Sequence, residues 1–310
     1  MTGRLRATAA GFALVVAVAF GAARIAAAAP TVAFERPGGG PRAAAMGGHV
    51  IALTDDDYAM GSNPSRLAFA DSSASAQYDR VDPGLNLWRG RLGVACPLGR
   101  DASEPLQTSH VHRTALGAAI DVTHLGLIEG SAYREVALSV GGAVAPLNLF
   151  ALGVTARYER ASSSLDGIGA KAWGVDVGAT LDLADHWVTG LAIRNALGRA
   201  QFDGANDEDR PAEFTLGLAT AHRRLFQAEV DYVLQRNTTS ALSGGVEVHV
   251  LPGVLDLRAG VAREMLGSAR VIPSAGAAFL FQRYRLDYAF RSDRDGGFDA
   301  QHQLALGARF

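Results

Sequence analysis

The chain has 310 residues, of which 48% are hydrophobic and 19% are charged, and its net charge is −2. This length allows one large domain, and the near-neutral charge argues against a nucleic-acid partner, which would favour a basic surface. A single cysteine, Cys96, excludes an intramolecular disulfide framework.

Residues 1–29 have the pattern of a secretory signal peptide. Arg4 and Arg6 give a positively charged start, and an apolar run rich in alanine follows from Ala7 to Ala23. An uncleaved membrane anchor is the alternative, but the run consists largely of small residues and is interrupted by Arg24. We therefore expect export from the cytoplasm. No later stretch reaches the roughly 18 consecutive apolar residues of a spanning helix.

Residues 30–72 are predicted to form a proline- and glycine-rich linker followed by a compact, turn-rich segment. Gly47-Gly48 permits close approach of the backbone. Asn63-Pro64 is a turn signal, because proline keeps the preceding residue out of the helical region. The run Asp55–Asp57 lacks the spaced ligands and the glycine of a calcium loop, so it predicts a solvated or capping acidic turn and no metal site.

Residues 73–310 are dominated by segments in which apolar and polar side chains alternate. From Tyr284 to Phe290, for example, aromatic or apolar residues occupy every second position, and arginine and aspartate occupy most positions between them. Such alternation is typical of β-strands with two chemically different faces. We predict about fourteen strands, each of a length that suits an oblique bilayer crossing, at 75–81, 85–96, 112–121, 131–143, 147–158, 170–183, 186–195, 212–221, 225–235, 239–250, 254–263, 272–281, 283–291 and 302–310.

The orientation of the two faces decides the fold class. A water-soluble closed barrel of this strand number would enclose a large apolar void, because side chains fill barrels of only about eight strands. Two stacked sheets that bury the apolar faces are the alternative. A transmembrane antiparallel β-barrel places the apolar faces against lipid and satisfies every backbone polar group by closure. We predict this all-β barrel, with lumen charges at Arg157, Asp176, Asp182, Arg194, Glu229, Asp231, Glu247, His249, Asp256, Arg258, Arg283, Arg285 and Asp287.

Connections are expected to be short on one side of the barrel, as at Pro252-Gly253, and longer on the other, as at 101–109, 159–169, 200–211 and 292–300. The lipid-facing set includes aromatic residues that predict interfacial girdles: Tyr158, Trp173, Trp187, Tyr232, Tyr284 and Tyr288.

The segment 42–67 resembles the N-terminal signature of the FadL/PorV superfamily of outer-membrane proteins. It departs from that signature at Ser65 and Arg66, where the family usually has alanine and glycine. The stretches 190–198, 255–263 and 285–290 resemble strands of the same family, with one extra residue before Gly198 in the first. The resemblance implies a plug or hatch near the periplasmic mouth that contains Arg42, Met46, Gly47, Gly48, Asp55, Asp56, Asn63 and Pro64.

The chain ends in an alternating strand whose final residue, Phe310, resembles the sorting signal that the outer-membrane assembly machinery reads. The resemblance implies location in the outer membrane of a Gram-negative-type bacterium. The expected partners are outer-membrane lipid, that assembly machinery, and either secretion machinery or a hydrophobic ligand.

No enzyme is predicted, because the sequence has no Gly-x-Ser-x-Gly elbow. His110 and His112 share a predicted face but have no defined third ligand, so neither a metal nor a cofactor is predicted. The size and the compact N-terminal motif are closest to the PorV/PorQ-like branch, which implies secretion or surface attachment, or a plugged channel. The alternatives are a passive transporter of hydrophobic small molecules such as fatty acids, and a structural barrel without conductance.

Overall fold

The computed structural model describes residue 34 and residues 39–82, 86–98, 113–126, 132–147, 149–164, 169–184, 187–204, 207–222, 225–235, 239–265, 270–292 and 300–310. The predicted signal peptide and the pair His110 and His112 lie outside the described residues, so these predictions stay untested.

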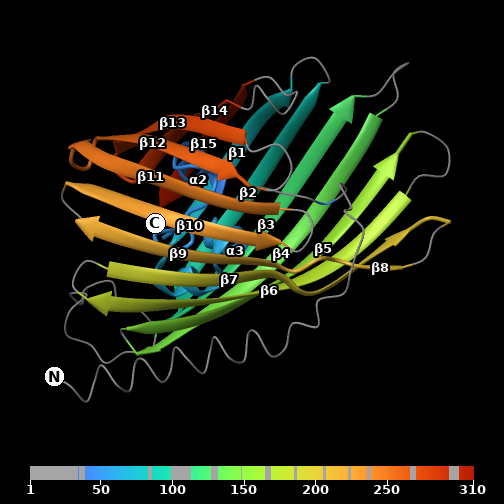
Figure 1. Ribbon diagram of the computed structural model, residues 1–310, viewed down its shortest axis with the longest axis horizontal. Coiled ribbons are helices and arrows are strands. Elements are labelled where there is room, and N and C mark those ends of the chain that lie inside the picture. The colour runs from blue at the N-terminus through green and yellow to red at the C-terminus, as the bar shows by residue number, and fades with distance from the viewer. Residues whose placement is uncertain are drawn as a thin grey trace.

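Fourteen long antiparallel strands form a closed barrel (Figure 1). Neighbours in sequence are neighbours in the sheet, and pairing of the first strand with the last closes the ring. The strands are β1 (Ser73–Asp82), β2 (Leu87–Leu98), β3 (Arg113–Gly126), β4 (Ala132–Leu147), β5 (Phe150–Ser163), β6 (Gly169–Ala184), β7 (Trp187–Phe202), β9 (Glu213–His222), β10 (Phe226–Gln235), β11 (Thr239–Leu251), β12 (Leu255–Glu264), β13 (Arg270–Phe281), β14 (Tyr284–Arg291) and β15 (Gln301–Arg309). A two-residue strand, β8 (Glu208–Asp209), pairs only with the far end of β7. The predicted all-β barrel and its strand number are confirmed.

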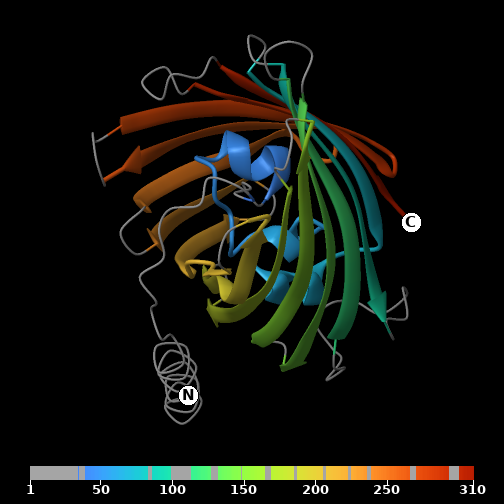
Figure 2. The ribbon, with the colours of Figure 1, turned by 90° about the vertical axis from the view of Figure 1, so that its right-hand side faces the viewer.

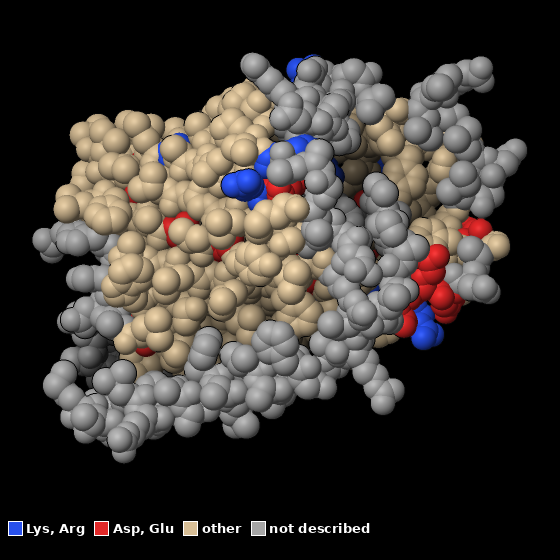
Figure 3. All heavy atoms as spheres, viewed as in Figure 1, with Lys and Arg blue, Asp and Glu red and all other residues tan. Residues whose placement is uncertain are grey.

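Apolar side chains cover the outside of the barrel. Leu138 and Val140 on β4 are 51% and 63% exposed, whereas Ser139 between them is 6% exposed and faces the lumen. Uncharged residues cover most of the described surface in Figure 3. Because exposed apolar surface on this scale is stable only against lipid, the molecule has the surface of a transmembrane barrel and not of a buried sandwich.

The two ends of the barrel differ in their connections. Five of the connections at one end, 148–149, 185–186, 223–225, 252–254 and 282–283, are short, and we call this the turn end. The opposite end, called the loop end, carries longer connections such as 203–212 and 292–300. One prediction was wrong. The connection that contains 101–109 was expected on the same side as the other long loops, but β2 ends and β3 begins at the turn end.

Exposed aromatic residues on the outer face gather towards both ends. Tyr78, Tyr158, Trp173, Tyr232 and Tyr288 lie in the loop-end parts of their strands, and Trp187, Phe226, Phe279, Phe281 and Tyr284 lie near the turn end. This is the arrangement expected for the aromatic girdles of a membrane barrel.

The segment before β1 folds inside the barrel (Figure 2). It contains α2 (Gly40–Ala45), α3 (Ala59–Ser62) and the 3₁₀ helix η1 (Pro64–Phe69). We call residues 39–69 the plug. Its helices are short, as the density of glycine and proline predicts. Among the described residues, no helix combines the length and the apolar character needed to span a membrane.

Candidate functional site: a plug held inside the barrel

The Asn63-Pro64 motif attaches the plug to β6. Asn63 is fully buried, and its amide nitrogen donates to the Ile51 carbonyl at 2.9 Å and to the Thr180 hydroxyl at 3.2 Å. Its amide oxygen accepts from the backbone N–H and the hydroxyl of Ser65, which caps η1. The side chain therefore fixes the turn and the contact with the wall at once.

Glycine residues in the wall make room for the plug backbone. A Cβ atom on Gly153 would lie 2.3 Å from the carbonyl carbon of Pro64, and one on Gly178 would lie 2.0 Å from the Asn63 side chain. On the other side of the lumen, a Cβ on Gly260 would lie 2.3 Å from the carbonyl carbon of Met46. Main-chain atoms cannot give way as a flexible side chain can, so side chains at these wall positions and the docked plug exclude each other.

We expect Gly260→Val to displace the Met46 end of the plug and leave the barrel intact, because valine is a good strand residue but overlaps the plug backbone. Limited proteolysis in detergent should then cleave within residues 39–50, which are protected in the natural protein. Gly307→Val is a steric control, because Gly307 lies in β15 without a positive φ and a Cβ there would meet its nearest neighbour at an ordinary 3.9 Å. Equal protection of both variants would contradict this close fit.

Glu229 on β10 holds a second part of the plug. This carboxylate is 2% exposed and accepts from three consecutive backbone N–H groups, those of Ile51 and Ala52 at 2.6 Å and of Leu53 at 3.2 Å. A buried carboxylate stays ionised most easily when several N–H groups donate to it. Asp231, two residues further along β10, faces the lumen on the same side of the strand and is 1% exposed.

Arg42 joins the plug to a line of alternating charges on the wall, which we call the ion ladder. Its guanidinium is bidentate to Glu247, at 3.1 and 3.0 Å, and also donates to the Leu53 carbonyl at 3.0 Å. Glu247 accepts from Arg258 at 2.5 Å, Arg258 donates to Asp287 at 2.6 Å, and Asp287 pairs with Arg285 at 2.8 Å. Each buried charge thus has a partner of opposite sign, as burial in a low-dielectric interior requires.

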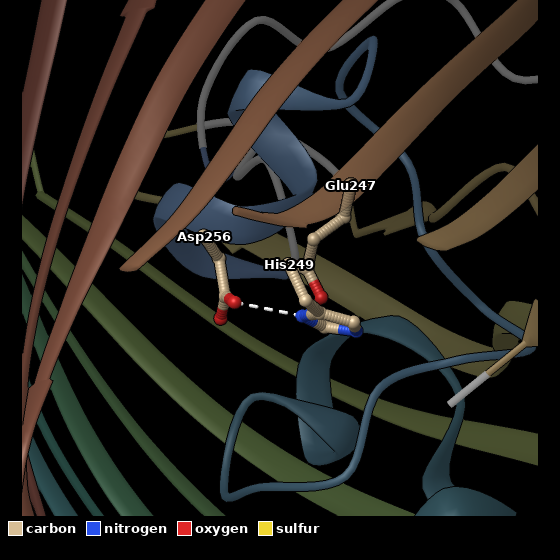
Figure 4. Close-up of side chains that lie close together, drawn as sticks. All are labelled: Glu247, His249 and Asp256. Carbon is tan, nitrogen blue, oxygen red and sulfur yellow. Dashed lines mark hydrogen bonds and ion pairs between the residues drawn. The ribbon is translucent and has the colours of Figure 1, made fainter. Parts of the chain in front are cut away.

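The ladder adjoins a group of three possible metal ligands. Glu247, His249 and Asp256 each offer an atom within 4.8 Å of the others, and their side chains point toward one another (Figure 4). The His249 Nδ1 and an Asp256 oxygen are 2.7 Å apart. Because Arg42 and Arg258 already neutralise Glu247, a cation here would face two fixed positive charges. The group therefore belongs to the ladder.

The acidic turn of the plug faces β2. Arg91 donates to the Asp57 carboxylate at 3.2 Å and pairs with Asp121 at 3.3 Å, while its guanidinium lies 5.0 Å from the Tyr58 ring centre. Burial, followed by the charges of Asp57 and Asp55, raises the pKa of Asp56 to about 7. Burial lowers the pKa of His49 to about 4, which keeps this plug histidine neutral at neutral pH.

Arg66 stands where the family resemblance expects glycine. Its backbone is part of η1 and is not among the positive-φ residues, so glycine is not required there. Its side chain donates to the Thr54 carbonyl at 2.8 Å and stacks over Phe69 at 4.6 Å. The substitution thus adds a plug contact.

A polar cavity of about 70 Å³ remains between the plug and β1–β5. Its lining includes Arg89, Arg91, Asp79, Asp121 and Arg157. Arg157 pairs with Asp176 at 3.0 Å, and Arg194 beside it donates to the Gly61 carbonyl at 2.9 Å. Such a space suits only a few water molecules.

One phenylalanine of the linker occupies an apolar pocket in the lumen. Phe34 is 2% exposed and packs against Ala161, Ala170, Ala172 and Ala200, with Tyr133 and Phe202 beside them. Its N–H donates to Glu135 at 3.1 Å, and its carbonyl accepts from Arg210 at 3.0 Å. Sequence analysis missed this residue, because a single phenylalanine in a linker carries no periodic signal.

The structure brings most of the predicted site residues together between plug and wall. One prediction was wrong: Arg283 is not in the lumen but lies exposed in the turn between β13 and β14, where it donates to the Tyr284 hydroxyl at 3.2 Å. The tight turn takes up Gln282 and Arg283, so the alternation begins one residue later than expected. Phe310 is 70% exposed beside the end of β15, and its sorting role stays a prediction.

Fold and site together define a plugged transmembrane β-barrel. No family model and no curated protein matches the chain. Solved structures do match: the toluene transporter TodX of Pseudomonas putida has a TM-score of 0.64 at 13% identity, covering 89% of this chain and 99% of that chain. The toluene transporter TbuX of Ralstonia pickettii has a TM-score of 0.63 at 15% identity, covering 89% and 100%. A FadL homologue of Pseudomonas aeruginosa has a TM-score of 0.58 at 14% identity, covering 91% and 99%. This chain has the fold of those channels.

Proposed function

We propose that this protein is an outer-membrane channel of the FadL superfamily for the passive passage of small hydrophobic molecules. The fold it shares with hydrocarbon transporters supports this proposal, as do the outward apolar surface and the plug. The predicted secretion or surface-attachment role rests on sequence resemblance alone, and the structural likeness favours the alternative of hydrophobic transport.

The pocket of Phe34 is the observation that carries the proposal. The side chain of phenylalanine is a benzyl group, so its pocket already accommodates a monoaromatic ring within an otherwise charged lumen. Alanine side chains leave space for the ring, and the aromatic residues Tyr133 and Phe202 offer favourable ring contacts. The linker ring and an apolar solute of the same size therefore compete for one site.

This competition explains how a channel can stay closed to water. Both backbone polar groups of Phe34 are bound by charged side chains, Glu135 on β4 and Arg210 in the connection before β9, so the ring is held in the pocket from two sides. A hydrophobic molecule that displaces the Phe34 ring would replace the contacts between ring and pocket with equivalent apolar contacts of its own. A hydrated ion offers no such exchange, because it would lose hydration without gaining a partner.

We expect Phe34→Ala to increase the rate at which cells expressing the protein take up radiolabelled toluene at low concentration by at least about tenfold. Burial of a phenylalanine ring contributes roughly 1.5–3 kcal/mol, and removing this internal competitor raises the apparent affinity by the corresponding factor. Phe279→Ala is the control, because Phe279 lies on the outer face of β13, away from the plug and the lumen.

Measuring the uptake of a labelled long-chain fatty acid by the same cells distinguishes a transporter of monoaromatic compounds from a transporter of long-chain compounds. If the natural protein gives no more uptake of either compound than cells without it, the proposed transport function is wrong.

A further inference from the structure

Three basic side chains form a row on the outer face at the loop end, which we call the basic row. They are Arg134 on β4, Arg160 on β5 and Lys171 on β6, all exposed. Their strands are adjacent, and Arg160 and Lys171 are direct cross-strand partners. They belong to the surface that meets lipid and not to the lumen, because Glu159 and Ala172 beside them point inward and are buried.

The row stands directly above the aromatic girdle. Tyr158 and Trp173 are 49% and 47% exposed, and they pair with each other two positions below Arg160 and Lys171. Two residues of strand correspond to roughly 7 Å. Below them the outer face is apolar, with Leu138 paired to Tyr158. Because aromatic girdles lie at the level of the lipid headgroups, the basic row lies at the height of headgroup phosphates.

The pairing of Arg160 with Lys171 is unfavourable without a ligand. Like charges directly opposite each other on neighbouring strands destabilise a sheet. Within the described part of the chain, no acidic group forms an ion pair with Arg134, Arg160 or Lys171. The nearby Arg199 differs, since it pairs with Asp207 and Asp209 at 3.7 and 3.6 Å. A bound anion between the two strands would turn this repulsion into attraction.

We propose that the basic row binds the phosphate groups of the phosphorylated glycolipid that forms the outer leaflet of such membranes. This inference rests on the proposed outer-membrane location, in which the short turns are periplasmic and the loop end is external. Guanidinium groups match phosphate oxygens in a bidentate manner, and the ammonium adds a compact charge. The aromatic and apolar residues below the row contact the acyl chains of the same lipid.

Native mass spectrometry of the purified, detergent-solubilised protein with added bisphosphorylated lipid A tests this site. The double variant Arg160→Gln, Lys171→Gln should bind the lipid roughly 25-fold more weakly, since each basic side chain at an anionic membrane surface contributes a factor of about five. The single variant Arg263→Gln removes an exposed outer-face arginine from β12 on the far wall and should leave binding unchanged. Phosphatidylglycerol and dephosphorylated lipid A should both bind more weakly than lipid A.

The variant Lys171→Glu gives a second readout. It should lose lipid A binding, yet unfold at a higher temperature than the natural protein in neutral detergent, because a repulsive pair becomes an attractive one. Retained lipid binding in the double variant, or equal binding of phosphorylated and dephosphorylated lipid, would overturn the proposal. Toluene uptake should be unchanged in every variant, so loss of lipid binding and loss of transport are separate results.

Discussion

Glu229→Ala is expected to raise the open probability of the barrel in planar lipid bilayers at least about tenfold, whereas the natural protein should show little or no steady conductance. The substitution leaves the N–H groups of Ile51, Ala52 and Leu53 without their acceptor. Each buried donor left unpaired costs roughly 1–3 kcal/mol. The substitution therefore destabilises the docked plug. It does not destabilise the undocked plug, because the N–H groups of the undocked plug bind water.

Two controls make the conductance result specific. Glu229→Gln keeps one side-chain oxygen as an acceptor and should have an intermediate effect. Glu264→Ala removes a carboxylate that pairs with Arg270 at the loop end, away from the plug, and should stay closed. Large steady currents from the natural protein would show that the plug does not seal the lumen.

Val140→Arg is expected to lower the free energy of unfolding by about 2–4 kcal/mol, the cost of an arginine on the lipid face at the bilayer midplane. Val140 lies midway along β4 and is 63% exposed on the outer face. In a water-soluble protein an arginine at so exposed a position would change stability little. Urea unfolding in phospholipid vesicles, followed by tryptophan fluorescence, measures the difference.

Leu234→Arg is the matched control for depth. Leu234 is exposed on the outer face of β10 near the loop end, and its cross-strand partners, Ser240 and Phe214, carry no charge. An arginine near the interface costs only about 0–1 kcal/mol. Equal destabilisation by the two substitutions, or none by Val140→Arg, would contradict the assigned lipid-facing surface.

The barrel was predictable from the sequence because its physics is local and repeated. Alternation with a period of two identifies each strand and the chemistry of its faces. The limits appear where periodicity ends: β3, β4, β5 and β7 extend further than expected, since hydrogen bonding to long neighbours continues a strand through weakly patterned residues such as Gly198.

A departure in the sequence pattern also marked a feature of the wall. The extra residue noted before Gly198 corresponds to a bulge in β7. There Val175 faces Leu197 and Val177 faces Ile193, and Asn195 adopts a positive φ of 51°. The sequence indicated an insertion but not its contacts. The Asn195 N–H donates to Asp176 at 2.8 Å, and Arg157 donates to both side chains, so these contacts depend on three strands, β5, β6 and β7, meeting in space.

The plug was predicted from motifs, but its partners were not. Arg42 and Glu247 are separated by 205 positions, and no local pattern indicates which carboxylate an arginine will meet. The sequence also did not show which glycine residues of the wall contact the plug, because a glycine inside a strand pattern indicates only that some other group approaches the backbone closely. These contacts depend on the closure of the barrel, which is a property of the whole chain.

The close fit of the plug between opposite walls has a consequence for biogenesis. Met46 lies against β12 and Asn63 against β6, while the seam that completes the cylinder joins β1 to β15. A finished cylinder offers no spare width for a segment touching both sides. We therefore expect the N-terminal segment to act as a template around which the sheet closes during folding. Deleting this segment should slow insertion of the barrel into the membrane as well as leave the pore open.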